Sequence, residues 1–182
     1  TDSFILRISR EVGIDMRVID YQSEANYALM GCRVLVKPGT QHVLLFDIGG
    51  GSTELVWAEV TSDGQSNVLD SMSIPYGVVN LHELFQTDLR THYQKTSNEV
   101  YEAARAFRKR NHIREAHRQH PVQLLGTSGT TTTVAAVKLN LRYYDREKVD
   151  GITLTFDDAQ DVIKQIQLMS HHERMTHPCI GF

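Results

Sequence analysis

The chain has 182 residues, 41% of them hydrophobic, which is enough for the core of one domain and part of a neighbouring one. Its net charge of −3 gives no electrostatic case for a nucleic-acid partner, and no apolar run approaches the length of a membrane span. The two cysteines, Cys32 and Cys179, lack the spacing of metal ligands, so their simplest interpretation is as reduced thiols in a cytoplasmic protein.

Hydrophobic spacing predicts two helices and a short strand in the first part of the chain. The first helix ends at Gly13, a residue typical of helix C-termini, and its apolar positions are Phe4, Ile5, Ile8 and Val12. Alternation over residues 14–19 predicts a strand, and residues 22–31 predict a second helix. The sequence Lys-Pro-Gly-Thr at residues 37–40 predicts a loop before the central strand.

The rest of the chain predicts a meander of strands followed mostly by helices. The meander has strands at 43–47, 53–60 and 68–74, with a hairpin turn at 62–65. After Gly77 the expected elements are helices at 78–85 and about 98–119, a strand at 122–125, and helices at 130–140, 157–169 and 171–175. Asp157 or Asp158 is placed to cap the helix at 157–169, and Ser170 with Glu173 fits a capping box for the last one.

A turn of three glycines after the first strand of the meander carries the strongest functional signal. Gly49, Gly50 and Gly51 leave bare backbone N–H groups that can reach an anion, and the hydroxyls of Ser52 and Thr53 add donors. The flanking carboxylates of Asp47 and Glu54 would repel phosphate unless a cation such as Mg²⁺ lay between them. The segment therefore indicates a metal and phosphate site, although glycine clusters also form plain hairpin turns.

A second cluster of small and hydroxylic residues follows the strand at 122–125. It comprises Gly126, Thr127, Ser128, Gly129 and Thr130, and an apolar helix comes after it. A helix start presents unpaired N–H groups and a partial positive charge, so strand, turn and helix in this order favour anion binding. Two such turns in one chain strengthen the prediction of a phosphate site.

These segments resemble the Ppx/GppA phosphatases, the exopolyphosphatase and guanosine pentaphosphate phosphohydrolase family of the actin-like ATPase superfamily. The string Asp-Ile-Gly-Gly-Gly-Ser-Thr-Glu at residues 47–54 is highly specific to that family. The other matching segments, in the family's order, are Ser23-Glu24-Ala25 with Gly31, residues 73–81, residues 126–130 and residues 170–174. The resemblance covers nearly the whole chain.

The resemblance implies a fold, a reaction and roles for particular residues. The fold is an α/β domain of the actin-like ATPase (ribonuclease H-like) type, a mixed sheet with flanking helices. The reaction is removal of a terminal phosphate from polyphosphate or guanosine pentaphosphate by an activated water, with Mg²⁺ as cofactor. Glu24 and Glu54 match the catalytic glutamates, and Asp47 matches the aspartate expected to bind the metal. The phosphate is expected on Gly49, Gly50, Gly51, Ser52, Thr53, Gly126, Thr127 and Ser128.

Two departures from the family pattern suggest that the chain is a piece of a longer enzyme. The phosphate loop Asp-Leu-Gly-Ser-Asn-Ser of the family's first domain is absent, and so is its later Arg-Ala-Asp segment. We therefore expect residues 1–38 to be the tail of the first actin-like domain and residues 39–182 to be an incomplete second domain. Such a piece is expected to hydrolyse polyphosphate only near background and to form a homodimer through the apolar face of its first helix.

Several alternatives stay open on the residues themselves. Glu24 on an amphipathic helix and Glu54 on a strand can simply face solvent. The whole protein can also be a phosphate or nucleotide sensor or a scaffold that does not hydrolyse, although a pure binder gains nothing from acids beside phosphate. The basic run from Arg105 to Arg118 can guide a polyanion, but Glu99, Glu102 and Glu115 are interleaved with it or adjoin it, which favours a solvated helix face.

Overall fold

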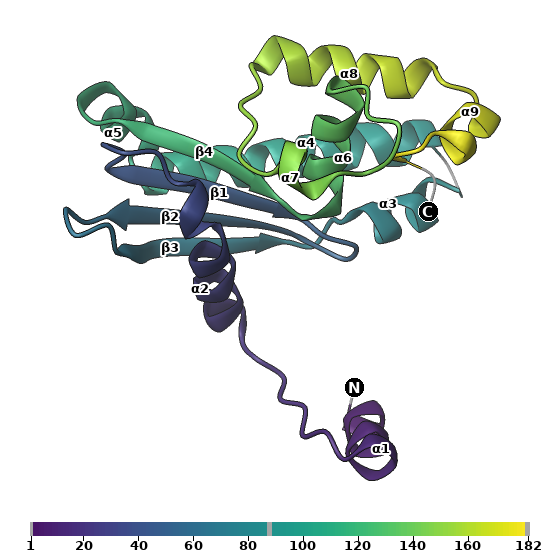
Figure 1. Cartoon of the computed structure of the whole chain (residues 1–182), viewed down its shortest axis with the longest axis horizontal. Helices are drawn as coiled ribbons and strands as arrows, with labels where there is room; N and C mark the ends of the chain where they lie inside the picture. The colour runs from purple at the N-terminus through teal and green to yellow at the C-terminus, as the bar shows by residue number, and fades with distance from the viewer. Residues whose placement is uncertain (1, 87–88, 181–182) are drawn as a thin grey trace.

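A four-stranded mixed sheet lies at the centre of the computed structural model, which describes residues 2–86 and 89–180. The strand order is β3-β2-β1-β4, with β1 antiparallel to β2, β2 antiparallel to β3, and β4 parallel to β1 (Figure 1). The predicted meander and the later strand are confirmed. The strands are β1 (His42–Ile48), β2 (Thr53–Val60), β3 (Ser66–Ile74) and β4 (Val122–Thr127).

Alternate residues of each strand pack into two different cores, because successive side chains point to opposite faces of a sheet. On one face Val43 and Leu45 pack with the helix α2 (Tyr21–Cys32), which confirms the helix predicted at 22–31. The short 3₁₀ helix η1 (Arg33–Leu35) follows α2 on that face. On the other face Trp57 packs with Phe107 of α4 (Leu89–Arg110).

The single helix predicted at about 98–119 is wrong, because the chain forms two helices there. The helix α4 begins at Leu89, and α5 (Ile113–Gln119) follows a break at His112, whose φ of 49° is left-handed. The side-chain amide of Asn111 holds the break by donating to Asp70 Oδ2 at 2.6 Å and to the carbonyl of Phe107 at 3.0 Å. This change of direction buries Ile113 beside Phe107 and Trp57, which a straight helix would not do.

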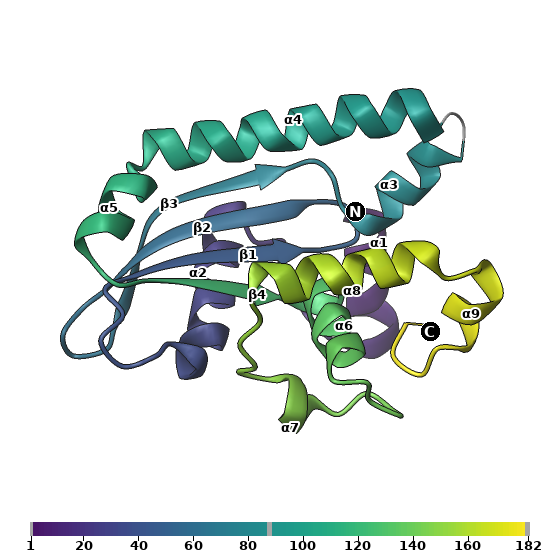
Figure 2. The ribbon, with the colours of Figure 1, turned by 90° about the horizontal axis from the view of Figure 1, so that it is seen from above.

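The last third of the chain forms a helical group with its own small core. Figure 2 shows this group on the β4 side of the sheet, away from β3. Its core contains Ala136, Val149 and Cys179. The elements are α6 (Ser128–Lys138), α7 (Arg146–Val149), α8 (Phe156–Leu168) and α9 (His171–Thr176), of which the sequence did not predict α7.

Of the two predicted helix N-caps, the one at α8 is wrong and the one at α9 is confirmed. Thr155 caps α8, rather than Asp157 or Asp158, and Asp158 instead accepts from the backbone and hydroxyl of Thr155 in a capping box. Thr155 has the extended backbone that an N-cap needs, whereas the two aspartates already lie inside the helix. The capping box of Ser170 and Glu173 at α9 is confirmed.

The N-terminal segment stands apart from the rest of the molecule. The helix α1 (Asp2–Val12) forms as predicted and ends at Gly13, whose φ is +70°, but none of its residues is buried (Figure 1). The strand predicted at residues 14–19 is wrong: the segment has no regular structure, because no described strand lies beside it to pair with. Within residues 2–86 and 89–180, no helix has both the length and the apolar character to cross a membrane.

Candidate active site

The three glycines form a tight hairpin turn between β1 and β2. The N–H of Gly49 donates to the carbonyl of Ser52 at 3.0 Å, so Gly50 and Gly51 occupy the tip of the turn. The hairpin interpretation of the glycines is therefore right about the backbone. It leaves Asp47 and Glu54 as direct partners across the two strands, where like charges repel each other.

A row of polar side chains crosses the end of the sheet next to this turn. Thr127, Asp47, Glu54 and Ser73 are successive partners on β4, β1, β2 and β3, so they share one face of the sheet. That face is the one covered by α2, and Glu24 of α2 lies against it. The structure thus brings the three predicted carboxylates together in one pocket, lined by Glu24, Ala25, Ala28, Leu45, Asp47, Glu54 and Val56.

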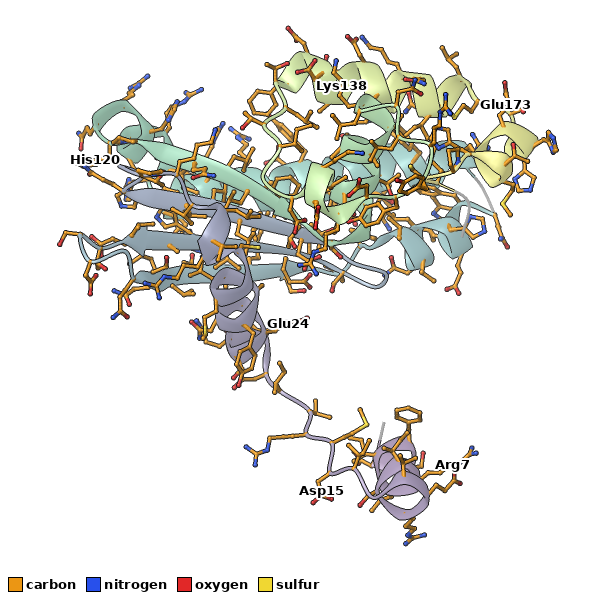
Figure 3. All side chains as sticks on the ribbon, viewed as in Figure 1. Arg7, Asp15, Glu24, His120, Lys138 and Glu173 are labelled. Carbon is orange, nitrogen blue, oxygen red and sulfur yellow. The ribbon has the colours of Figure 1, made fainter. Side chains whose placement is uncertain are left out.

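The carboxylates of Glu54 and Glu24 differ in how they are held. Both Ser52 and Ser73 donate their hydroxyls to Oε1 of Glu54, the latter at 3.1 Å. Glu24 is exposed and projects freely from α2, as Figure 3 shows, and its carboxylate has no hydrogen-bond partner in the described part of the chain. Glu54 is therefore fixed in place, whereas Glu24 is free to reach a ligand in the pocket.

The helix α3 (Val78–Phe85), predicted with these bounds, packs its N-terminus directly on the glycine turn. The N–H groups of Val78 and Val79 donate to the carbonyls of Gly49 and Gly50 at 2.9 and 2.8 Å. Asn80 adds a side-chain bond to the carbonyl of Gly51 at 2.6 Å. These bonds hold the turn's carbonyls on the side of α3.

Consequently the N–H groups of the turn remain free to donate hydrogen bonds. Among residues 2–86 and 89–180, nothing accepts a hydrogen bond from the N–H of Gly50, Gly51 or Ser52. The predicted hydroxyl donors are used differently: Ser52 donates to Glu54, and Thr53 donates to the carbonyl of Tyr76 at 2.8 Å. The backbone of the turn, more than its hydroxyls, is available to an anion.

Gly77 is a site residue that its sequence context alone did not single out. A Cβ atom there would lie 2.4 Å from the carbonyl carbon of Gly50 and 2.5 Å from the oxygens of Gly49 and Gly50. Only glycine permits this close approach of α3 to the turn. The motif Pro-Tyr-Gly before a helix was the signal that could have found it.

The second predicted turn joins β4 to α6 and touches the first. The helix begins at Ser128, two residues earlier than predicted, and Ser128 has a left-handed φ of 75° that is uncommon for serine. The hydroxyl of Thr130 donates to the carbonyl of Ile48 at 3.2 Å. Gly126 has a packing role, since a Cβ there would lie 2.6 Å from the ring of Phe46. The two turns therefore meet at one end of the sheet.

The oxygen donors of the pocket suit a hard cation with few protein ligands. The described side chains include no group of three or more His, Cys, Asp and Glu that could hold a metal by themselves. Mg²⁺ commonly binds through one or two carboxylates and takes its other ligands from water and phosphate. The opposed carboxylates of Asp47 and Glu54 fit that pattern, because a cation would relieve their repulsion.

Cys32 lies beside this row and stays a thiol. It is buried, and burial raises the pKa of its thiol above the ordinary value, with the nearby charge of Asp47 acting in the same direction and a hydrogen bond to Thr127 acting against it. Both Cys32 and Cys179 are free, as the sequence predicted. The thiol of Cys32 is therefore part of the packing under the site.

A comparison with family models identifies the chain. The model described as the Ppx/GppA phosphatase family matches residues 1–177. The chain belongs to this family. Among curated proteins, the bifunctional 3-dehydroquinate synthase/phosphatase of Fusobacterium nucleatum is 28% identical over 163 residues, which are 88% of this chain and 23% of that protein.

Solved structures of the family agree in fold. A Ppx/GppA family member from Aquifex aeolicus is 31% identical with a TM-score of 0.65, over 97% of this chain and 54% of that one. An exopolyphosphatase-like protein is 30% identical with a TM-score of 0.76, over 98% of this chain and 55% of its own. The chain thus has the actin-like ATPase fold of these relatives and spans about half their length.

Proposed function

We propose that the pocket belongs to a phosphohydrolase that releases the terminal phosphate of inorganic polyphosphate or of guanosine pentaphosphate by attack of a metal-assisted water. The observation that carries the proposal is the meeting of Glu24, Asp47 and Glu54 in one pocket beside the free amides of the glycine turn. Phosphoryl transfer depends mostly on positioning and charge neutralisation. The free amides would position the phosphate, and a cation held by the carboxylates would supply the neutralisation.

The surroundings of each residue in the pocket suggest its role in the reaction. The amides of Gly50, Gly51 and Ser52 bind the oxygens of the phosphate that is transferred, with further support from the start of α6 at Thr127 and Ser128. Glu24 takes the proton of the attacking water, because its carboxylate is free and exposed to the pocket. Glu54, fixed by two serine hydroxyls, orients that water.

The metal proposed here is Mg²⁺. Asp47 would hold it, with Glu54 opposite on the neighbouring strand. When bound, Mg²⁺ supplies positive charge that offsets the negative charge of the phosphate oxygens. Without a cation, the two carboxylates would oppose the approach of any phosphate to the turn.

The choice between polyphosphate and a guanosine nucleotide is left to experiment. The full-length protein with Mg²⁺ should release inorganic phosphate from polyphosphate or from guanosine pentaphosphate, measured in parallel with ATP. Release from neither, together with retained binding, would refute hydrolysis and favour the sensor or scaffold instead. The isolated chain is expected to hydrolyse polyphosphate only near background.

A further inference from the structure

The outer faces of α4 and α5 form a basic surface at the far end of the sheet. We call Arg108, Lys109, Arg114 and Arg118 the basic end, and all four are exposed. Residues 103–120 contain six Arg or Lys and a single acid, Glu115, in a chain whose net charge is −3. This concentration of one sign of charge is larger than the composition of the chain would suggest.

Two of the three acids that neutralise this run in the sequence are engaged elsewhere, and the third, Glu115, is exposed on α5 and forms no ion pair among the described residues. Glu99 accepts from the hydroxyl of Tyr76 and lies 3.9 Å from Lys95. Glu102 pairs with Arg105 at 3.2 Å, one helical turn before the basic end. The interpretation as a mixed, solvated helix face therefore describes the middle of α4 and not its end.

The basic end itself is unpaired. Arg110 points away from it and donates to Asp70 at 2.7 Å. Within the described residues, none of the four members of the basic end takes part in an ion pair. Four neighbouring cations with Glu115 as the one acid among them repel one another, and a bound anion would relieve that repulsion.

The break at His112 arranges these cations in two short stripes. In α4 the first stripe is the adjacent pair Arg108 and Lys109, and in α5 the second is Arg114 and Arg118, which have the i, i+4 spacing of one helix face. The opposite faces are fixed by the buried side chains of Phe107 and Ile113. In Figure 3, nitrogen-tipped side chains project from the end of the molecule at which His120 is labelled.

We propose that the basic end binds a linear polyphosphate chain at a distance from the glycine turn. The identity of the anion rests on the proposed function. Each guanidinium group can bind two phosphate oxygens at once, and a row of cations can contact the evenly spaced negative charges of a polyphosphate chain. A nucleic acid fits less well, because Phe107 is buried and the exposed Tyr101 lies about two helical turns before Arg108, so residues 108–118 offer no Phe, Tyr or Trp for a base to stack on.

The two phosphate-binding regions lie at opposite ends of β1. The strand starts at His42, whose ring lies 5.7 Å from that of His120 at the end of α5, and it finishes at Ile48 beside the glycine turn. The length of the strand, seven residues at about 3.3 Å each, separates the two regions by roughly 20 Å. They also lie on opposite faces of the sheet, because α2 covers the pocket face and α4 and α5 pack on the other. Only a long polyphosphate can reach both regions, so the basic end favours long chains over tripolyphosphate and nucleotides.

The test compares two quadruple variants of the chain. The first neutralises the basic end: Arg108→Gln, Lys109→Gln, Arg114→Gln and Arg118→Gln. The matched control removes the same charges from exposed positions elsewhere: Arg10→Gln, Arg17→Gln, Arg142→Gln and Lys164→Gln. Binding of long-chain polyphosphate and of tripolyphosphate is measured by calorimetry at several salt concentrations, and circular dichroism verifies that both variants are folded.

Neutralising the basic end should weaken binding of the long chain by about tenfold or more and make the slope of log affinity against log salt shallower by about 2 to 3. The control variant and tripolyphosphate binding should change little. Equal binding by the two variants would overturn the proposal, and so would a single-stranded oligonucleotide that binds as tightly as polyphosphate.

The inference and the proposed function can fail separately. Glu54→Gln should leave binding at the basic end intact, since Glu54 lies on β2 opposite Asp47, at the end of the sheet away from α5. If the full-length protein hydrolyses no phosphate substrate but the chain still binds long polyphosphate through the basic end, the proposed function is refuted and the inference stands.

Discussion

At the residue scale, the two glutamates of the pocket should both be needed for turnover. Glu24→Gln and Glu54→Gln in the full-length protein are expected to lower kcat by about 10² to 10⁴-fold, because each removes a carboxylate from proton transfer or from orienting the water. Substrate binding should change far less, since the amides of the glycine turn are untouched. Steady-state phosphate release, analysed for kcat and KM, measures both effects.

The control for this pair is Glu59→Gln, on the same strand as Glu54 but exposed at its other end. It should behave as the unaltered protein. Wild-type turnover in the Glu24 and Glu54 variants would remove these residues from the mechanism.

His42 gives the chain a dependence of stability on pH. Burial, followed by the nearby charge of His120, lowers the pKa of His42, while Glu59 acts in the opposite direction. Its Nδ1 is buried without a partner, and its ring stacks on Trp57 at 5.0 Å. Because the folded chain binds this proton less readily than the unfolded chain, the stability due to neutral His42 is complete above about pH 6.5 and is lost as the pH falls below that value.

We therefore expect His42→Phe, which keeps a ring on Trp57, to reduce the loss of unfolding free energy between pH 7 and pH 5. Urea denaturation at pH 7, 6 and 5 measures this. His171→Phe, at an exposed position of α9, is the control and should leave the pH dependence as it is. If the unfolding free energy of the His42 variant falls with pH as steeply as that of the unaltered chain, His42 does not cause the pH dependence.

At the scale of elements, α3 and the glycine hairpin act as one unit. Gly77→Ala would place a Cβ 2.4 Å from the backbone of Gly50, so the helix and the turn must move apart. We expect a loss of about 1–3 kcal/mol of unfolding free energy, the usual range for overpacking. Phosphate release should fall as well, because the amides of the turn are displaced.

Chemical denaturation measures the change in unfolding free energy. The control for Gly77→Ala is Gly31→Ala. A Cβ at Gly31 meets nothing within 4 Å, and alanine favours the interior of α2, so this variant should be stabilised by up to about 1 kcal/mol. Equal stability of the two variants would mean that the packing of α3 on the turn is not tight.

Elements with a clear local sequence pattern were predicted well, including β4, whose partner β1 is distant in sequence, whereas features caused by distant contacts were not. The hairpins and α3 follow from turn residues and local periodicity. The break between α4 and α5 was missed because its cause is burial of Ile113 and the bond of Asn111 to Asp70, some forty residues earlier. Residues 14–19 alternate like a strand, but a strand forms only where another strand lies beside it.

At the scale of the whole molecule, the exposed apolar residues of α1 predict self-association. Phe4 and Val12 are 57% and 60% exposed, and patches of this kind commonly bind a partner. We expect the isolated chain to sediment as a dimer, and the double variant Phe4→Ser and Val12→Ser to shift it to monomer. Arg10→Ser, at a polar position of the same helix, should have no effect, and a monomeric unaltered chain would contradict the prediction.

The sequence alone determined the membership of the family, the four strands in their order and the identity of Asp47 and Glu54 as acids beside a glycine turn, because these depend on short segments with specific residues. Only the tertiary structure decided that Glu24, on a helix more than twenty residues earlier, lies against the same end of the sheet. It also decided that α3 holds the turn's carbonyls and leaves its amides free. Side chains from separate elements meet only when burial of the apolar faces of the sheet fixes where each helix packs.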